Sequence, residues 1–271
     1  MSRHCDPAYL RGVQYKDAGN LNARIELHAR FSTNGYSWHR WVFDHLDVPP
    51  DSCLLDLGCG AGRMWIENRE RLSPGWTMYL ADVSMGMLRE AQQSLAGISQ
   101  VRAWLVADVQ RVPLRAGRFD CVLANHMLYH VGDRARALRE IARLLVPGGL
   151  LIASTVGDNH IKEIDEQLRA VGVSAEFLGR ASSALFTLEN GAPQLREAFR
   201  EVTGHRYSDA LEVTDVGPLM AYIASMKCGP QLTAAAVDQI RARFGAEIER
   251  QGAARITKVS GLFVARHPVA R

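Results

Sequence analysis

The sequence lacks the marks of several protein classes. Its 271 residues contain no apolar run long enough to cross a membrane, and the charged, polar N-terminus does not resemble a secretory signal. No internal repeat or low-complexity segment occurs. The cysteines are odd in number, scattered, and form no C-x-x-C pair. We therefore expect a reduced, cytoplasmic protein with no metal site and no membrane partner. The five cysteines are Cys5, Cys53, Cys59, Cys121 and Cys228.

No charge of one sign dominates either, because 32 lysines and arginines stand against 29 acidic residues. Arginines at 134, 136, 139 and 143 lie close together, but their spacing is typical of the exposed face of an amphipathic helix. We favour that interpretation over a nucleic-acid patch and expect no nucleic-acid partner. The length suits one α/β domain with an appended piece.

What is present is a glycine-rich turn after a short apolar run. Residues 53–57 (CLLDL) have the pattern of a buried parallel strand, and Gly58, Gly60 and Gly62 follow it. Glycines allow a tight turn and a close approach of the backbone to a ligand. Strand, turn and helix in this order begin a nucleotide-binding α/β fold. The spacing is not G-x-G-x-x-G, however, and Asp56 precedes the turn, which suits a cationic or amine-bearing ligand better than a pyrophosphate.

The run Leu-Asp-Leu-Gly-Cys-Gly-Ala-Gly resembles the first motif of the class I S-adenosylmethionine-dependent methyltransferases. The later segments 118–124 (RFDCVLA) and 145–151 (LVPGGLL) resemble further signatures of that family. The resemblance covers residues 50–156. Within the family, the chain looks like the small-molecule branch, which includes quinone-biosynthesis and natural-product enzymes. It implies S-adenosylmethionine as cofactor and S-adenosylhomocysteine as product. Segment 20–34 also looks like a run in uncharacterised bacterial members.

Two acids follow at the spacing that such a fold needs. We expect a strand over 77–81 that closes with Asp82, a position where an acid binds ribose hydroxyls in this kind of fold. The alternative role, capping the next helix, fits Ser84 better than Asp82. Asp108 and Val109 follow a strand over 101–106, where the resemblance implies contacts with adenine. Asp120, by contrast, is expected to be structural. The resemblance implies these cofactor-binding residues: Asp56, Gly58, Cys59, Gly60, Asp82, Val83, Met85, Asp108, Val109, Asn125 and His126.

The segment after the fourth strand carries the candidate catalytic residues. In an open α/β sheet this edge faces the ligand crevice. His126, Tyr129 and His130 are candidate bases, needed only if the acceptor must lose a proton. His28, His39 and His160 are further candidates, and a structural role stays open for each histidine. The four-residue spacing of His126 and His130 would place both on one side of a helix, but no third ligand for a metal stands nearby.

Two helical patterns precede the first strand, over residues 20–29 and 36–46. The resemblance implies a lid over cofactor and acceptor, for which Tyr15, Phe31, Trp38 and His160 are the candidate substrate-binding residues. The alternative is that the lid aromatics only pack against the sheet. An aromatic wall suits an apolar or aromatic acceptor, and it also suits carbon methylation of a prenyl or terpenoid-indole substrate. A second copy of the chain could associate through these helices.

The expected fold is α/β: a Rossmann-like, seven-stranded, mostly parallel sheet with an antiparallel last strand and helices on both faces. We expect helices over 64–71, 85–96, 133–145, 161–170, 193–202, 215–226 and 233–251, and late strands over 150–154, 207–213 and 256–266. The expected division is a lid over 1–48 and a methyltransferase domain over 49–271, with helical inserts over about 157–204 and 215–252. Methyl transfer to a small-molecule, secondary-metabolite intermediate is the expected function. An RNA or protein methyltransferase is the alternative, although neither a basic groove nor an Asn-Pro-Pro-Tyr motif is present.

Overall fold

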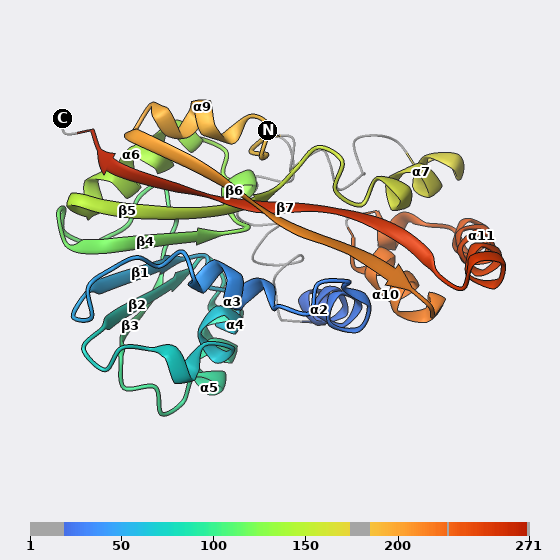
Figure 1. Cartoon of the computed structure of the whole chain (residues 1–271), viewed down its shortest axis with the longest axis horizontal. Helices are drawn as coiled ribbons and strands as arrows, with labels where there is room; N and C mark the ends of the chain where they lie inside the picture. The colour runs from blue at the N-terminus through green and yellow to red at the C-terminus, as the bar shows by residue number, and fades with distance from the viewer. Residues whose placement is uncertain (1–18, 174–184, 227, 270–271) are drawn as a thin grey trace.

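The computed structural model describes residues 19–173, 185–226 and 228–269. Its seven-stranded sheet has the order β3-β2-β1-β4-β5-β7-β6 (Figure 1). The first five strands run parallel, and β7 is antiparallel to both neighbours. The predicted fold is therefore confirmed. The strands are β1 Cys53–Leu57, β2 Thr77–Asp82, β3 Val101–Val106, β4 Phe119–Asn125, β5 Leu145–Val156, β6 Phe199–Val213 and β7 Ala254–Pro268.

Several helices begin where the sequence placed a capping residue. Side-chain oxygens of Ser84, Asp133, Asp215 and Thr233 each accept a hydrogen bond from a backbone N–H in the first turn of α5, α6, α10 and α11. The helices are α2 Gly19–Phe31, α3 Trp38–Phe43, α4 Arg63–Ile66, α5 Met85–Ser94, α6 Arg134–Leu144, α7 Lys162–Ala170, α9 Gly191–Arg196, α10 Val216–Ser225 and α11 Ala234–Gln251, with 3-10 turns η3 Arg69–Arg71, η4 Leu128–His130 and η6 Gly229–Gln231.

The sheet is covered on both faces, which explains the continuous apolar strands in the sequence. Successive residues of a strand point to opposite faces. Leu55 packs in the cluster that α6 and α9 cover, whereas Leu54 packs in the cluster of α3 and α4, and both side chains are fully buried. At the start of the sheet, Asp120 accepts a hydrogen bond from the Cys53 backbone N–H at 2.8 Å. This contact joins β4 to β1 and is consistent with the structural role expected for Asp120.

A third apolar cluster lies beyond the end of β5. The strand β7 pairs with β5 only from Ser260 onwards, and its earlier residues pair with β6 alone. The two strands therefore extend past the sheet as a ribbon, and α2, α7, α10 and α11 pack around it (Figure 1). Leu27 of α2 shares this cluster with Ile223 of α10. The two N-terminal helices thus contact different cores, while the division of the chain at residue 48 stays a prediction.

Three local expectations were wrong. The strand β6 begins at Phe199, so the helix expected over 193–202 is the shorter α9, because pairing with β7 along the whole of β6 outweighs local helix propensity. The helix expected over 64–71 is divided into α4 and η3, and β5 begins at residue 145 rather than 150. None of these differences moves the carboxyl ends of the parallel strands.

Candidate functional site

The glycine turn lies between β1 and α4 and contacts the end of β2. The backbone N–H groups of Gly58 and Cys59 donate to the Ala81 carbonyl at 2.7 and 3.0 Å. Gly58 has a φ of 76°, and a Cβ there would lie 3.0 Å from the Met127 side chain. Gly60 also has a positive φ, 54°, but a Cβ there would meet nothing within 4 Å. The backbone at Gly60 therefore faces open space, as a ligand-binding turn requires.

Beneath this turn lies a buried carboxylate with an unused oxygen. Asp56 accepts from the Trp65 indole N–H at 2.8 Å through Oδ2, while its Oδ1 has no hydrogen-bond partner among the described residues. The Asn125 Oδ1, at the end of the adjacent strand β4, is likewise buried and unpaired among them. Burial, opposed by the Trp65 hydrogen bond and reinforced by the charge of Asp82, raises the pKa of Asp56 to about 7. Two uncompensated acceptor oxygens beside the turn fit a cationic group such as an ammonium.

Asp82 ends β2 on the other side of the glycine turn. Its carboxylate accepts from the Gly60 N–H at 3.0 Å and from the Ser84 N–H at 2.8 Å. Burial raises its pKa despite these hydrogen bonds. Two bonds leave further lone pairs for ribose hydroxyls. Val83 is partly buried, and Met85, at the start of α5, is 52% exposed. An exposed apolar side chain at this position suits a flat ligand face.

The residues predicted for the adenine end follow β3, the edge strand next to β2. Asp108 is exposed, and its carboxylate accepts from the backbone and side-chain N–H groups of Gln110. Val109 is buried and contributes to the apolar cluster under α6. The side chain of Cys59 is partly buried, and burial raises its pKa well above the usual value, so it is a neutral thiol. The predicted cofactor residues thus lie along neighbouring strand ends.

The acceptor-side candidates meet at the end of β4. The His126 backbone N–H donates to Ser154 Oγ at 3.0 Å, and its φ of 49° turns the chain out of the strand. Its ring lies 5.1 Å from that of Trp38 and 6.4 Å from that of Tyr129. The ring of His130 follows at 4.6 Å from Tyr129. Residues 128–130 form one 3-10 turn, so His126 and His130 do not share a helix.

Burial, helped by the charge of His39, lowers the pKa of His126 to about 4. The imidazole is therefore neutral at physiological pH and able to accept a proton. Trp38 also contacts Trp41 and Tyr207, each with ring centroids 5.3 Å apart. This aromatic group joins α3 to β6 next to His126. Phe43, by contrast, is buried against Trp76 and belongs to the core.

The remaining candidate substrate-binding residues lie in different parts of the fold. Phe31 is 8% exposed and packs in the cluster around the β6–β7 ribbon, away from the aromatic group of Trp38. His160 follows β5, and its Nδ1 accepts from the Val259 N–H at 3.2 Å. Tyr15 lies outside the described residues. The sequence did not single out Tyr207 or Lys258. No local motif marks them, because only the pairing of β6 with β7 places them near the aromatic group of Trp38.

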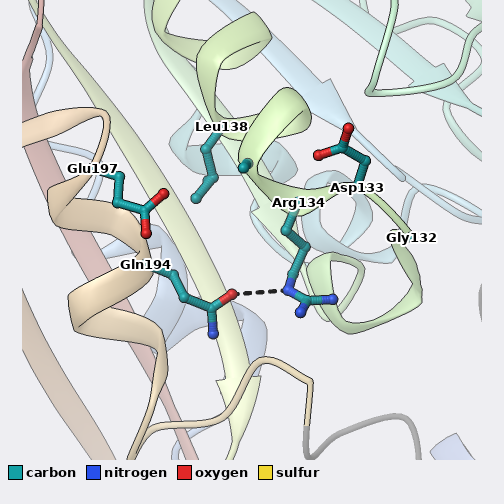
Figure 2. A pocket seen from close by; sticks show the side chains of 7 residues that line it. Gly132, Asp133, Arg134, Leu138, Gln194 and Glu197 are labelled. Atoms are coloured by element: carbon teal, nitrogen blue, oxygen red, sulfur yellow. Dashed lines mark hydrogen bonds between the residues drawn. The ribbon is translucent and has the colours of Figure 1, made fainter.

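A separate pocket of about 330 Å³ lies at the start of α6 (Figure 2). Arg134 crosses it and donates to Gln194 of α9 at 2.8 Å, and the Glu197 carboxylate lines its other side. It contains none of the predicted site residues. Among the described residues, no group of three or more histidine, cysteine, aspartate or glutamate side chains is placed to hold a metal ion. Nor does any described helix combine the length and apolarity needed to cross a membrane.

Comparison with known proteins agrees with this geometry. A family model described as a methyltransferase domain matches residues 55–153, from β1 into β5. The malonyl-[acyl-carrier protein] O-methyltransferase of Methylovorus sp. is 35% identical over 117 residues, which are 41% of this chain and 39% of that protein. The ubiquinone/menaquinone biosynthesis C-methyltransferase of Pasteurella multocida is 31% identical over 117 residues, 42% of this chain and 44% of that protein. The matched curated relatives are covered over only 33% to 65% of their length.

Solved structures resemble the whole described fold at low identity. A [4+2]-cyclase superposes with a TM-score of 0.60 and 18% identity, over 96% of this chain and 97% of that chain. A Haemonchus contortus phosphoethanolamine N-methyltransferase 2, in complex with S-adenosylhomocysteine, superposes with a TM-score of 0.58 and 16% identity, over 98% of this chain and 61% of that chain. Fold and strand-end residues together define a Rossmann-like methyltransferase domain of class I. Residues 55–153 match the methyltransferase domain model, and the sheet around them has the class I fold.

Proposed function

We propose that this protein transfers a methyl group from S-adenosylmethionine to a small, apolar or aromatic acceptor, such as a secondary-metabolite intermediate. The observation that carries the proposal is the pair of buried, unpaired oxygens on Asp56 and Asn125 beside an open glycine turn. A buried acceptor without a partner is costly, so an ammonium-bearing ligand at this turn is favoured. The family match over residues 55–153 supports the same conclusion.

The described residues fit the cofactor along its length. Asp56 and Asn125 would face the ammonium end, Gly58, Cys59 and Gly60 would pass beneath the ligand, and Asp82 would accept from the ribose. Asp108 and Val109 would meet the adenine, with Val83 and Met85 along its face. When bound, the sulfonium supplies an electrophilic methyl carbon, so the protein has mainly to align the acceptor and exclude water.

His126 is the proposed base for an acceptor that must lose a proton. Its ring is neutral and adjoins the Trp38 aromatic group. Tyr129 and His130 continue from it in ring contact and are proposed to orient it or to relay the proton. Trp38 and His160 would contact the acceptor. We propose that Phe31 only supports the packing behind the site and does not contact the acceptor, because its side chain is buried.

Carbon methylation is a second candidate. The rings of Trp38, Trp41 and Tyr207 form a contiguous aromatic group beside His126. Aromatic faces stabilise a developing cation, as methylation of a prenyl or indole carbon requires. Replacing Trp38 and Trp41 singly with Leu would then reduce turnover more than acceptor binding, whereas equal losses in both would favour a wall with no electronic role.

The cofactor assignment is tested by thermal melting with S-adenosylhomocysteine, with NAD as control. A ligand at 100 times its dissociation constant stabilises the fold by about 2.7 kcal/mol. We expect a shift with S-adenosylhomocysteine only, reduced in Asp82→Asn and kept in Asp51→Asn, whose side chain lies in an exposed turn. Asn is preferred to Ala because Asp82 also holds the glycine turn. A shift with NAD alone would refute the proposal.

A further inference from the structure

The helix α3 packs against the segment that directly follows the glycine turn, which consists of α4 and η3 (Figure 1). Asn68, between α4 and η3, is fully buried and donates from Nδ2 to the Met64 carbonyl at 2.8 Å and to the His39 carbonyl at 3.1 Å. Arg71 donates to the Arg40 carbonyl at 3.3 Å. Backbone carbonyls of α3 are thus bonded to side chains of this segment, so α3 is held to α4 and η3.

Glu67, directly after α4, is the acidic centre of this contact. The Ser37 hydroxyl donates to its Oε2, while Arg63 Nε and His39 Nδ1 donate to its Oε1 at 2.9 and 3.1 Å. The Glu67 side chain is 24% exposed. Burial alone would raise the pKa of Glu67, but these hydrogen bonds lower it to about 2. The carboxylate is therefore ionised at neutral pH and accepts from all three side chains at once.

The hydroxyl of Ser37 makes a second hydrogen bond, which begins α3. Ser37 is the N-cap of this helix, and its Oγ accepts from the His39 backbone N–H at 3.2 Å. Because the single hydroxyl proton points to Glu67, the lone pairs of Oγ are left to face the helix. The next residue is Trp38, whose ring lies 5.1 Å from that of His126. The place of this aromatic ring therefore depends on the carboxylate of Glu67.

The same short segment also contacts the residues proposed for the cofactor. Arg63, which binds Glu67, follows Gly62 of the glycine turn directly. Trp65 is fully buried and donates from its indole N–H to Asp56 Oδ2 at 2.8 Å. Residues 63–67 thus connect the carboxylate beneath the glycine turn with the N-terminus of α3.

We propose, resting on the methyl transfer above, that Glu67 is a positioning residue, which holds the N-terminus of α3 so that Trp38 stays against His126 at a constant place relative to the glycine turn. It acts through Ser37 and His39 and has no role in contacting the cofactor or the acceptor. Methyl transfer requires the acceptor, the methyl carbon and the sulfur to be aligned, and a small misplacement of a binding residue is costly. Fastening Trp38 to the segment after the glycine turn preserves that alignment.

A displacement of α3 would change the pKa of His126 in a known direction. Burial is the first cause of its low pKa, about 4, and the charge of His39 is the second. Trp38 and His39 both lie in the first turn of α3. The other charges that lower this pKa, those of Lys258 on β7 and His130 in η4, would stay in place. Loss of the contact with Glu67 should therefore raise the pKa of His126 towards its usual value of 6.5.

Two NMR measurements on the full chain test this role. Fluorine NMR of protein labelled with 5-fluorotryptophan reports the place of Trp38, whose signal is assigned with Trp38→Phe. Glu67→Leu removes the acceptor for Ser37, so the Trp38 signal should shift or broaden. In a proton NMR titration, the pKa of His126 should rise by at least about one unit in Glu67→Leu, a tenfold gain in proton affinity.

Two further variants separate positioning from a general loss of stability. Glu67→Gln keeps a side-chain oxygen for Ser37, so the Trp38 signal and the pKa of His126 should stay close to wild type although the fold is less stable. Glu70→Gln is the matched control, because Glu70 also binds α3, through Arg40, but is 58% exposed. We expect S-adenosylhomocysteine to bind all three glutamate variants as tightly as wild type in calorimetric titration, since Asp82 still holds the glycine turn.

An unchanged Trp38 signal or an unchanged His126 titration in folded Glu67→Leu would overturn the inference, and so would equal changes in Glu70→Gln. If Glu67→Leu does not fold, Ser37→Ala removes the same contact from the other side and leaves the Glu67 carboxylate in place. It should move both readouts in the same direction, and Ser37→Thr, which keeps the hydroxyl, should restore them; failure of either expectation would also overturn it. Failure of wild type to bind S-adenosylhomocysteine is a different result and would refute the proposed function instead.

Discussion

Replacing Asp56 with Asn should stabilise the ligand-free protein and weaken cofactor binding, because the wild-type carboxylate is buried where its ionised form is unfavourable. Its pKa rises from 3.8 to about 7 on folding, which corresponds to about 4 kcal/mol of cost for the ionised form. The folded state binds the extra proton, so this group stabilises the protein most below pH 3.8. That contribution is lost as the pH rises through 7. At pH 8 the ionised side chain therefore destabilises the ligand-free protein.

The side-chain amide introduced by Asp56→Asn would keep an oxygen for the Trp65 indole and place an unpaired NH₂ group where Oδ1 now lies. The unpaired amide group costs about 1–3 kcal/mol, against about 4 kcal/mol recovered from the buried charge. We expect Asp56→Asn to be about 1–3 kcal/mol more stable than wild type at pH 8 without ligand, a gain of several degrees in melting temperature. Below pH 4 this gain should vanish, because wild-type Asp56 is then protonated.

The cofactor response should move in the opposite direction. S-adenosylhomocysteine carries an ammonium, which would lower the pKa of Asp56 and so release a proton on binding. Its stabilising effect on wild type should therefore grow between pH 6 and pH 8, on either side of the pKa of about 7, and most of it should be lost in Asp56→Asn. Scanning calorimetry across pH, with Asp51→Asn as control, measures both. A variant less stable at pH 8 with an unchanged ligand shift would refute the reasoning.

Three further outcomes are expected. Burial would raise the pKa of Glu67, but hydrogen bonds from His39, Ser37 and Arg63 lower it to about 2. Glu67→Gln should therefore lower the free energy of unfolding by about 1–2 kcal/mol at pH 7, after solvent screening. Urea unfolding should show this difference vanish as the pH falls from 4.5 towards 2. The acidic limb of the pH–rate profile should lie near 4, the pKa of His126, and not near 6.5; a limb near 6.5 would exclude His126 as the base. Asp209→Asn should destabilise by about 3–5 kcal/mol because Lys258 stays buried and unpaired, and adding Lys258→Met should recover much of the loss in a double-mutant cycle.

The residues proposed for the cofactor could be selected from the sequence because each of their motifs is local. The turn at residues 58–62 needs glycines within five positions, and Asp82 follows its own strand directly. In a parallel sheet these strand ends meet at one edge whatever the loops between them do. Sequence spacing therefore carried the prediction that Asp56, Asp82 and Asn125 lie at one edge of the sheet. The contacts of Asp82 with the turn itself needed the structure, because they depend on the register of β1 against β2.

Sequence by itself determined the class I fold and the choice of candidate cofactor residues, since local propensity and spacing decide these features. Tertiary structure alone decided how α2 meets the β6–β7 ribbon. Ser32 and Lys258 lie 226 positions apart, and only the antiparallel pairing of β6 with β7 and the packing of α2 on that ribbon bring them into hydrogen-bond contact. Such long-range contacts depend on the register of whole elements, which no local pattern of residues specifies.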